Sequence, residues 1–566
     1  MTRASRLIGV ARGQAKADLV LRDARIVNTL TGCIEHGDVL ISVGHIAAIG
    51  CFDSARRVVD LGGAFLLPGL IDGHTHIESS MLHPARYAEA VVPHGTLTLV
   101  TDLHEIANVC GVEGIEFCMR WSARLPLEMK FMAPSCVPAT SLETSGAALN
   151  AGAIRALMRK RDVIGLGEVM NYPGVLSGST EVLEKLEAAR GRPVDGHAPG
   201  LRGRDLSAYV AAGIMSDHEC TSLDEASEKL AAGMRIMIRE GSSEKNLEAL
   251  LPLAAGETYR RCMFVVDDRS AADLYYEGDI DHVVRKAVSL GLDPVRAVQL
   301  ATINPAEYFR LYDRGAVAPG MAADLVTVES LEEFVVDRVF RRGVLVAKGG
   351  KALFPVPETT AQLTDTVRLG TLDHQALRVA RTGTDFPVVG LIPGQIVTRK
   401  RMLTPGVSGD EYVSDPERDI LKLVVVERHH ATGHVGKGFV TGFGLTRGAI
   451  AGSVAHDSHN LVCAGVSDDD ILGALRALER MQGGLVVFAD GEVKEALPLP
   501  VAGLLSPGPV QDVIATQRHL EEAARQLGAK PPAAFALLSF LALPVIPELR
   551  VTDLGVVDVG AFRVVA

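Results

Sequence analysis

The chain has 566 residues, too many for a single hydrophobic core, so two or three domains are expected. Hydrophobic residues make up 47% and charged residues 22%, a composition typical of a soluble globular protein. The net charge of −12, without any Lys/Arg-rich run, would repel a phosphate backbone and argues against nucleic acid polymers as partners.

The sequence also argues against membrane insertion and secretion. Residues 1–20 have no apolar core of signal-peptide length. The most apolar window, residues 533–546, is short and contains Pro544, so it predicts a buried core segment and not a membrane span. The 8 cysteines form no Cys-x-x-Cys pair, which indicates reduced thiols in a cytoplasmic protein.

Two separated regions predict short strands joined by glycine-containing turns. Residues 18–65 and 315–350 both lack helical periodicity, so neither is expected to belong to a repeat of alternating strands and helices. We expect a small β domain from residues 1–65 and 315–355. The predicted strands are residues 18–21, 25–28, 38–43, 45–49, 324–328, 335–339 and 343–346.

The first strand after residue 65 ends in two histidines. An apolar run leads into His74 and His76, which are spaced i, i+2 and therefore point to the same side of a strand. Two neutral imidazoles that face one point suit a divalent metal. A lone His-x-His is more often an exposed strand end, but here Pro68-Gly69 opens the strand and Asp72-Gly73 precedes the pair.

Strand and helix patterns then alternate through residue 314. Eight strands are expected at spacings that a βα unit can fill, which predicts a (β/α)8 barrel over residues 66–314. Active sites of such barrels lie at the C-terminal ends of the strands. The predicted strand ends are His76, Asp102, about Ala133, Glu168, His197, His218, about Arg239 and Asp267.

Metal-ligand side chains end strands one, four, five, six and eight. Four histidines and two carboxylates exceed the needs of one catalytic metal, which keeps an open position. The set predicts a site for two divalent ions, of Mn, Fe or Zn, in which Glu168 bridges the pair. The predicted ligands are His74, His76, Glu168, His197, His218 and Asp267.

Asp267 and Asp268 both follow the last predicted strand, residues 262–266. Adjacent strand residues point to opposite sides, so only one of the two carboxylates is expected to face the barrel axis. Asp267 comes first after the apolar run, where we expect a regular pleat, and is assigned to the metal.

After residue 355 the pattern changes to a third, α/β domain over residues 356–566. Strands are expected at residues 420–426 and 485–489, and helices at 468–481 and 509–527. The glycine-rich residues 433–438 lack a Ser or Thr after their Lys, so they predict a turn-rich connection and not a P-loop.

Several motifs carry a family resemblance over nearly the whole chain. Residues 66–80, which contain His-Thr-His-Ile-Glu-Ser-Ser, resemble the first-strand signature of the amidohydrolase superfamily and, within it, the adenine deaminase family. The chain differs from the pattern expected for that family at Leu103, at residues 265–266 and at Ser270. Further similar stretches are residues 103–109, 195–201, 216–221, 237–242, 266–269, 319–325, 453–460 and 543–549.

The resemblance implies a barrel with a flanking β-sandwich and a metal-dependent deaminase that converts adenine to hypoxanthine and ammonia. In that reading a metal-bridging hydroxide attacks C6, and Asp267 moves its proton to the departing amine. Glu219, Glu105 and His104 are the other candidate catalytic groups, and a role in supporting the histidines is equally open for them. The candidate substrate-binding residues are Glu78, Ser79, Asp102 and Asp268.

Two alternatives remain open at this stage. A cyclic-amide hydrolase or dipeptidase of the same superfamily would also accept Glu168 in place of a carboxylated Lys, and a non-catalytic barrel scaffold ranks far lower because all six ligands are present. The expected partners are a purine base and further copies of the chain. We also hypothesise that His456, Asp457 and His459 support domain docking or close the active site.

Overall fold

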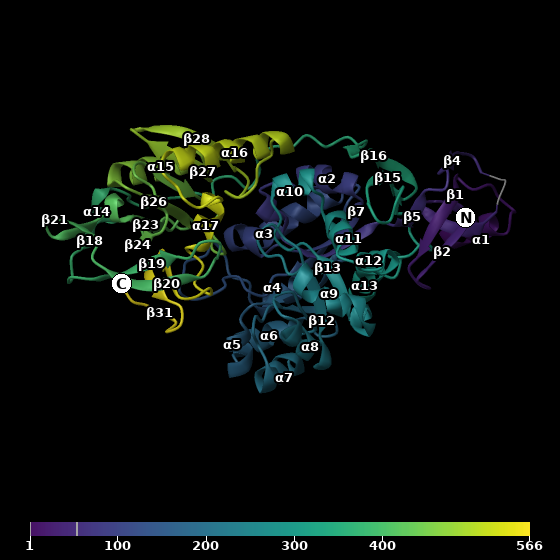
Figure 1. Ribbon diagram of the computed structural model, residues 1–566, viewed down its shortest axis with the longest axis horizontal. Coiled ribbons are helices and arrows are strands. Elements are labelled where there is room, and N and C mark those ends of the chain that lie inside the picture. Colours follow the sequence, from purple (N-terminus) through teal and green to yellow (C-terminus); the bar gives the residue numbers. More distant parts are fainter. Residues whose placement is uncertain (1, 52–54) are drawn as a thin grey trace.

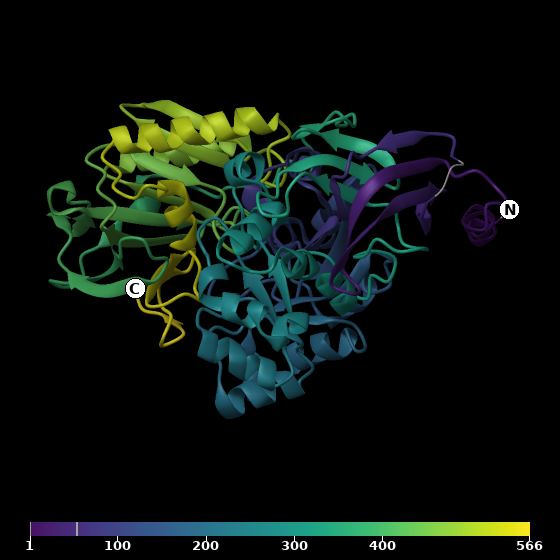
Figure 2. The same cartoon turned by 45° about the vertical axis from the view of Figure 1, so that its right-hand side comes forward.

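The structure is a computed structural model that describes residues 2–51 and 55–566. Three regions follow one another along its long axis (Figure 1): a sheet around the N-terminus, a central strand-and-helix region, and a large C-terminal region. The order is the same after a turn of 45° (Figure 2), and the C-terminal region lies directly against the central one in both views.

The N-terminal sheet has nine strands and combines the two separated β regions. Its order is β17-β16-β15-β14-β5-β1-β2-β3, with β4 beside β1. β14 pairs antiparallel with β5, which places Leu325 opposite Pro68. The elements are α1 (Arg3–Ala11), β1 (Leu19–Asn28), β2 (Cys33–Ser42), β3 (His45–Gly50), β4 (Val58–Asp60), β5 (Phe65–Pro68), β14 (Leu325–Val328), β15 (Val336–Arg341), β16 (Val344–Lys348) and β17 (Lys351–Ala352).

The strand prediction was wrong at one point in this sheet. Residues 18–21 and 25–28 were expected as two strands, but both belong to β1. Asp23 has a φ of 56°, and the register with β2 shifts between Leu21 and Ala24. The left-handed residue therefore forms a bulge that bends the strand, and pairing with β2 continues on both sides of it.

The eight predicted central strands are all present, in two parallel groups of five and three. One junction is formed by β6 and the segment after β13, where the amide of Asp267 donates to the carbonyl of His74 over 3.0 Å. At the other junction the amide of Met215 donates to the carbonyl of Val194 over 2.9 Å. The strands are β6 (Leu70–Thr75), β7 (Thr96–Asp102), β8 (Glu128–Ala133), β9 (Val163–Val169), β10 (Val194–Gly196), β11 (Ser216–Asp217), β12 (Arg235–Arg239) and β13 (Cys262–Val265).

Helices alternate with these strands, and side-chain caps define where several of them begin. Asn150 accepts a hydrogen bond from the amide of Ala153, and Ser222 accepts one from the amide of Glu225. The helices are α2 (Pro84–Val91), α3 (His104–Ser122), α4 (Ala151–Leu157), α5 (Tyr172–Ser177), α6 (Thr180–Ala188), α7 (Gly203–Ala211), α8 (Leu223–Ala231), α9 (Leu247–Ala255), α10 (Ala271–Tyr276), α11 (Ile280–Ser289), α12 (Pro294–Leu300) and α13 (Ile303–Tyr308).

The C-terminal region is built on an eight-stranded sheet of order β20-β19-β24-β23-β26-β25-β27-β28. Its long helices and two of its strands lie close to their predicted positions. The elements are α14 (His374–Leu377), β18 (Val379–Ala380), β19 (Phe386–Leu391), β20 (Thr398–Leu403), β21 (Gly406–Ser408), β22 (Glu411–Val413), β23 (Ile420–Val426), β24 (Val435–Thr441), β25 (Ala449–Gly452), β26 (Leu461–Gly465), α15 (Asp468–Met481), β27 (Gly484–Ala489), β28 (Glu492–Pro498), α16 (Val510–Gln526), α17 (Ala534–Phe540), β29 (Leu549–Thr552), β30 (Gly555–Asp558) and β31 (Arg563–Val564).

The glycine-rich residues 433–438 are not only a connection, because four of them begin β24. A Cβ on Gly436 would lie 1.7 Å from the carbonyl oxygen of Thr552, and one on Gly438 would lie 2.9 Å from Cγ2 of Val551. The glycines therefore allow the β29–β30 ribbon to pack directly on the sheet.

The window around residues 533–546 contains the short helix α17, whose Ala534, Phe535 and Leu538 are buried. Among the residues that the structure describes, every helix is too short or too polar to span a bilayer. All eight cysteines are free thiols.

Candidate metal centre

The six predicted ligands lie together at the C-terminal ends of the central strands. One group of donor atoms comes from His74, His76 and Glu168, and another from Glu168, His197 and His218; within each, the atoms lie within 4.8 Å of one another. A third group joins His74 and His218 to Asp267. The strands place these side chains at one mouth because each polar residue lies within two residues of the end of its strand.

Glu168 lies between two sets of histidines. Its Oε1 is 3.2 Å from Nε2 of His76, whereas its Oε2 is 2.7 Å from Nδ1 of His197 and 3.3 Å from Nε2 of His218. The two carboxylate oxygens therefore face different donors, as a ligand that bridges two ions requires.

Asp102 holds Glu168 from behind. Its Oδ2 accepts a hydrogen bond of 3.0 Å from the amide of Glu168, and its carbonyl is 2.8 Å from Nδ1 of His76. Gly167 makes room for this contact, because a Cβ there would lie 1.8 Å from Oδ2 of Asp102. Asp102 thus orients two of the predicted ligands.

Asp267 faces both histidines of the first strand. Its Oδ1 lies 3.3 Å from Nε2 of His74 and 3.2 Å from Nε2 of His76, and its Oδ2 accepts a hydrogen bond of 2.7 Å from Arg239. Burial would raise the pKa of Asp267, but the neighbouring imidazoles of His74 and His76 and the charge of Arg239 hold it well below its usual range. The carboxylate is ionised.

Asp268 accepts a hydrogen bond from the hydroxyl of Ser79, and one of its oxygens lies within 4.8 Å of donor atoms of His76 and Asp267. The side chains of Asp267 and Asp268 do make different contacts, as expected. The regular strand pleat on which this expectation was based does not extend to them. β13 ends at Val265, and Asp267 has a φ of 61°. A left-handed turn, rather than strand alternation, directs Asp267 to the histidines.

The donor atoms fit a divalent metal. Nε2 of His74 has no hydrogen-bond partner among the residues that the structure describes, although the side chain is buried. Burial and the neighbouring His218 lower the pKa of His74 to about 4, so it is a neutral ligand. The Nδ1 contact of His76 with the Asp102 carbonyl leaves the other ring nitrogen to face the cluster.

The C-terminal region reaches this cluster through Glu105, at the start of α3. One oxygen of Glu105 is bonded to Nδ1 of His456 and the other to Nε2 of His459. The preceding His104 lies with its Nδ1 3.5 Å from Oε1 of Glu168. The contact that we hypothesised for the His456–His459 segment is thus present, and both oxygens of Glu105 are occupied.

Glu219 and Arg239 form a second layer around the ligands. Arg239 donates to both Glu219 and Asp267, and Oε1 of Glu219 is 3.4 Å from Nε2 of His218. The sequence analysis treated Arg239 only as a strand end. Its predicted position at the end of strand seven was the signal that could have identified it as a site residue.

Glu78 is buried beneath the start of α3. Its Oε1 accepts a hydrogen bond of 3.2 Å from the amide of Ile106, and burial raises its pKa to about 7. This contact supports the helix that carries His104 and Glu105.

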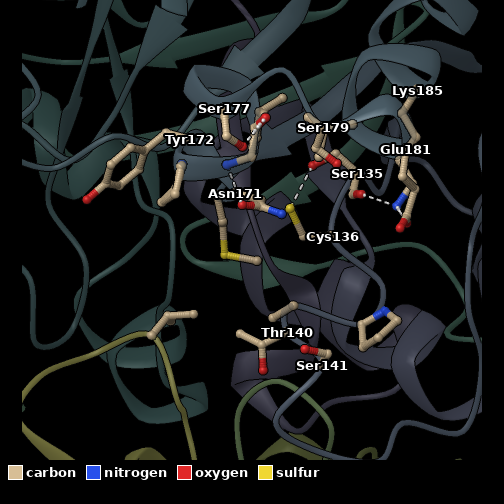
Figure 3. A pocket seen from close by; sticks show the side chains of 18 of the residues that line it. Ser135, Cys136, Thr140, Ser141, Asn171, Tyr172, Ser177, Ser179, Glu181 and Lys185 are labelled. Atoms are coloured by element: carbon tan, nitrogen blue, oxygen red, sulfur yellow. Dashed lines mark hydrogen bonds and ion pairs between the residues drawn. The ribbon is translucent and has the colours of Figure 1, made fainter. Parts of the chain in front are cut away.

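A cavity of about 910 Å³ lies beside the cluster, between the loop after β8, α5–α6 and residues near the C-terminus (Figure 3). On its wall the hydroxyl of Ser135 donates to the carbonyl of Glu168, and Nζ of Lys185 donates to the carbonyl of Ser135 over 3.0 Å. The wall of the cavity therefore contacts the backbone of Glu168, whose side-chain carboxylate faces His197 and His218.

Metal uptake by the apoprotein should release protons and weaken as the pH falls. Burial lowers the pKa of His218, but Glu168, Asp267 and Glu219 together raise it to about 9. Below that pH the metal-free imidazole holds a proton that must leave before it can bind a cation. Calorimetric titration with Mn²⁺ in two buffers of different ionisation enthalpy measures the release; identical heats in both buffers would contradict it.

Sequence comparisons agree with this geometry. The profile of the amidohydrolase family matches residues 65–346, and that of the adenine deaminase C-terminal domain matches residues 395–563. An adenine deaminase of Dehalococcoides mccartyi (strain ATCC BAA-2266 / KCTC 15142 / 195) is 54% identical over 565 residues, which cover 100% of this chain and 99% of the relative. Adenine deaminase 2 of Carboxydothermus hydrogenoformans is 50% identical over 561 residues, covering 99% and 98%.

Solved structures are more distant. L-Hydantoinase (dihydropyrimidinase) from Arthrobacter aurescens has 16% identity and a TM-score of 0.47, over 60% of this chain and 98% of that one. The full-length relatives establish the family: the chain belongs to the adenine deaminase family of the amidohydrolase superfamily.

Proposed function

We propose that this protein hydrolyses adenine to hypoxanthine and ammonia at the cluster around Glu168. The observation that carries the proposal is the placement of the two Glu168 oxygens against separate sets of histidines, with the ionised Asp267 beside them. Relatives named adenine deaminase over the full length support the choice of substrate.

We propose two divalent ions per chain, Mn or Fe in preference to Zn. Imidazole and carboxylate donors accept all three metals. Ions in such a site make water a stronger nucleophile at neutral pH and polarise the bond that it attacks. The residues that would hold them are His74, His76, Glu168, His197, His218 and Asp267.

Asp267 is the proposed proton carrier. Arg239 binds its Oδ2, which fixes the carboxylate and leaves Oδ1 toward the histidines. Oδ1 accepts a proton from the attacking water and delivers it to the amine that leaves C6. The salt bridge with Arg239 also keeps Asp267 ionised before each cycle.

The remaining candidate residues receive different roles. Glu219 and His104 contact the purine ring, and Asp268, held by Ser79, borders it beside Asp267. Glu105, Glu78 and Asp102 act through other residues as positioning groups, because their hydrogen bonds go to His456 and His459, to Ile106 and to Glu168.

The enzyme should prefer adenine to adenosine by about 100-fold or more in kcat/KM, because a site that binds a substrate N–H rejects an analogue that lacks it. The measurement is ammonia release from both compounds by Mn²⁺-loaded protein. A dihydropyrimidine and an isoaspartyl dipeptide serve as controls for the other hydrolase activities. Comparable values for adenine and adenosine would refute the preference.

We also propose three domains: residues 1–65 with 315–355, residues 66–314, and residues 356–566. The shared nine-stranded sheet supports the first. A homo-oligomer is proposed because exposed aliphatic side chains lie along β15–β17, among them Val335, Val344 and Leu353. The free cysteines support a cytoplasmic location.

A further inference from the structure

The loop between β8 and α4, residues 134–150, is held from two sides. The amide of Thr144 donates to Asp553 over 2.9 Å, and the side-chain amide of Asn460 donates to the carbonyl of Thr144 over 2.8 Å. On the barrel side, the hydroxyl of Ser145 donates to Oδ1 of Asn108 over 2.8 Å. The loop therefore has a fixed position between the barrel and the C-terminal region.

Glu143 in this loop carries a buried carboxylate without a hydrogen-bond partner. Its side chain is 7% exposed, and neither oxygen has a hydrogen-bond partner within residues 2–51 and 55–566. Asp457 is 4% exposed, and its Oδ2 is also unpartnered in the same described ranges. Ser458 lies close enough to lower the pKa of Glu143, but no hydrogen bond of good geometry reaches either oxygen among the described residues. Buried carboxyl groups normally accept such bonds, so the pair has room for a further donor.

The two carboxylates lie beside each other and next to the metal-ligand cluster. Burial and the nearby charge of Asp457 raise the pKa of Glu143 well above its usual range. Burial, followed by the charge of Glu105, raises the pKa of Asp457 to about 6, and Glu168 contributes in the same direction. His456, the neighbour of Asp457, is bonded to Glu105. The pair thus lies on the C-terminal side of the cluster.

A free purine base carries a donor of the kind that these carboxyl groups lack. When C6 of adenine faces the metal ligands, the imidazole ring with its N–H points away from them. A carboxyl group keeps an oxygen that accepts an N–H, and such a donor would pair an oxygen of Glu143 that is unpartnered among the described residues. A nucleoside carries a sugar on that nitrogen, so it has neither the donor nor the space.

We propose that Glu143 and Asp457 form the recognition site for the imidazole edge of the free purine base, in which Glu143 accepts the ring N–H. This rests on the proposed function and deepens it, because it assigns substrate selection to the barrel loop and the C-terminal region together. Glu143 is a specificity determinant, whereas the metal ligands act at the other end of the base.

The test compares Mn²⁺-loaded wild type, Glu143→Gln and Asp457→Asn in adenine deamination, with 9-methyladenine as an inhibitor that lacks the N–H. Glu143→Gln should raise KM for adenine by about 10-fold or more, while kcat stays within about 3-fold and the metal content is unchanged. The preference for adenine over 9-methyladenine should fall by a similar factor. A merely structural role would leave that preference unaltered.

Glu521→Gln is the matched control, since this carboxylate accepts from the amides of Ala534 and Phe535 on α17. It should leave KM and the methyl preference unchanged. An unaltered KM and preference in both Glu143→Gln and Asp457→Asn would overturn the inference, and so would the loss of one bound cation, which would assign the carboxylates to a metal. If the wild type deaminates adenine and the variants give those results, only this inference is disproved. If the wild type is inactive on adenine, the proposed function is disproved as well.

Discussion

Replacing Asp267 with Asn should lower kcat for adenine deamination by about 10²–10⁴, the usual effect of losing a general base. Asn keeps an oxygen that can face His74 and His76, so the protein should retain much of its metal. It cannot take up a proton, and it carries no charge to pair with Arg239. The measurement is kcat together with metal content, from variant and wild type purified side by side.

Asp268→Asn is the control for that experiment. Its carboxylate accepts from Ser79 and does not contact the histidines as Asp267 does, so a loss of about 10-fold is expected. If Asp268→Asn proved to be the inactive variant, the proton-transfer role would belong to Asp268.

Replacing Glu105 with Leu should lower the free energy of unfolding of the C-terminal region by about 3–5 kcal/mol, the typical cost of removing one partner from a buried ionic network. The substitution leaves the buried His459 and the partly buried His456 without their carboxylate. Scanning calorimetry and native-state hydrogen exchange of α17 and β25 would measure the change.

His459→Ala and the double variant complete a thermodynamic cycle. The two losses should not add, because both substitutions break the same contact. Glu521→Gln is the comparison. It removes the charge of another carboxylate, far from Glu105 in sequence, and so measures the general effect of such a loss on the stability of the C-terminal region. A Glu105→Leu protein with wild-type stability would show that the contact contributes nothing to docking.

The barrel and the clustering of the candidate ligands were predictable because each unit carries its own signal. A short apolar run predicts a strand, and the residue at its end must lie at the barrel mouth whatever the helices do. Glu168, His197 and His218 follow from this rule without any knowledge of contacts. Arg239 obeys the same rule but was left unassigned, since an arginine is not a metal ligand.

Other features depend on contacts that no local pattern records. Asp23 in β1 looks like a turn residue, and only the partner strand shows that it forms a bulge. Gly436 and Gly438 have the composition of a loop, yet their missing side chains make space for Thr552 and Val551. Asp267 faces the histidines, the direction that was predicted from a regular pleat; the strand ends before it, and a backbone turn produces the same direction.

Glu105 and the C-terminal histidines that bind it are far apart in the chain, so the ribosome makes them at different times. All six candidate ligands are made before His456 and His459, which follow Glu105 by 351 and 354 positions. At about 5–20 residues per second, the barrel is complete for roughly ten seconds or more before those histidines emerge. During that interval the start of α3 lacks the two histidines that later bind Glu105, so this side of the cluster stays open to solvent until the C-terminal region docks.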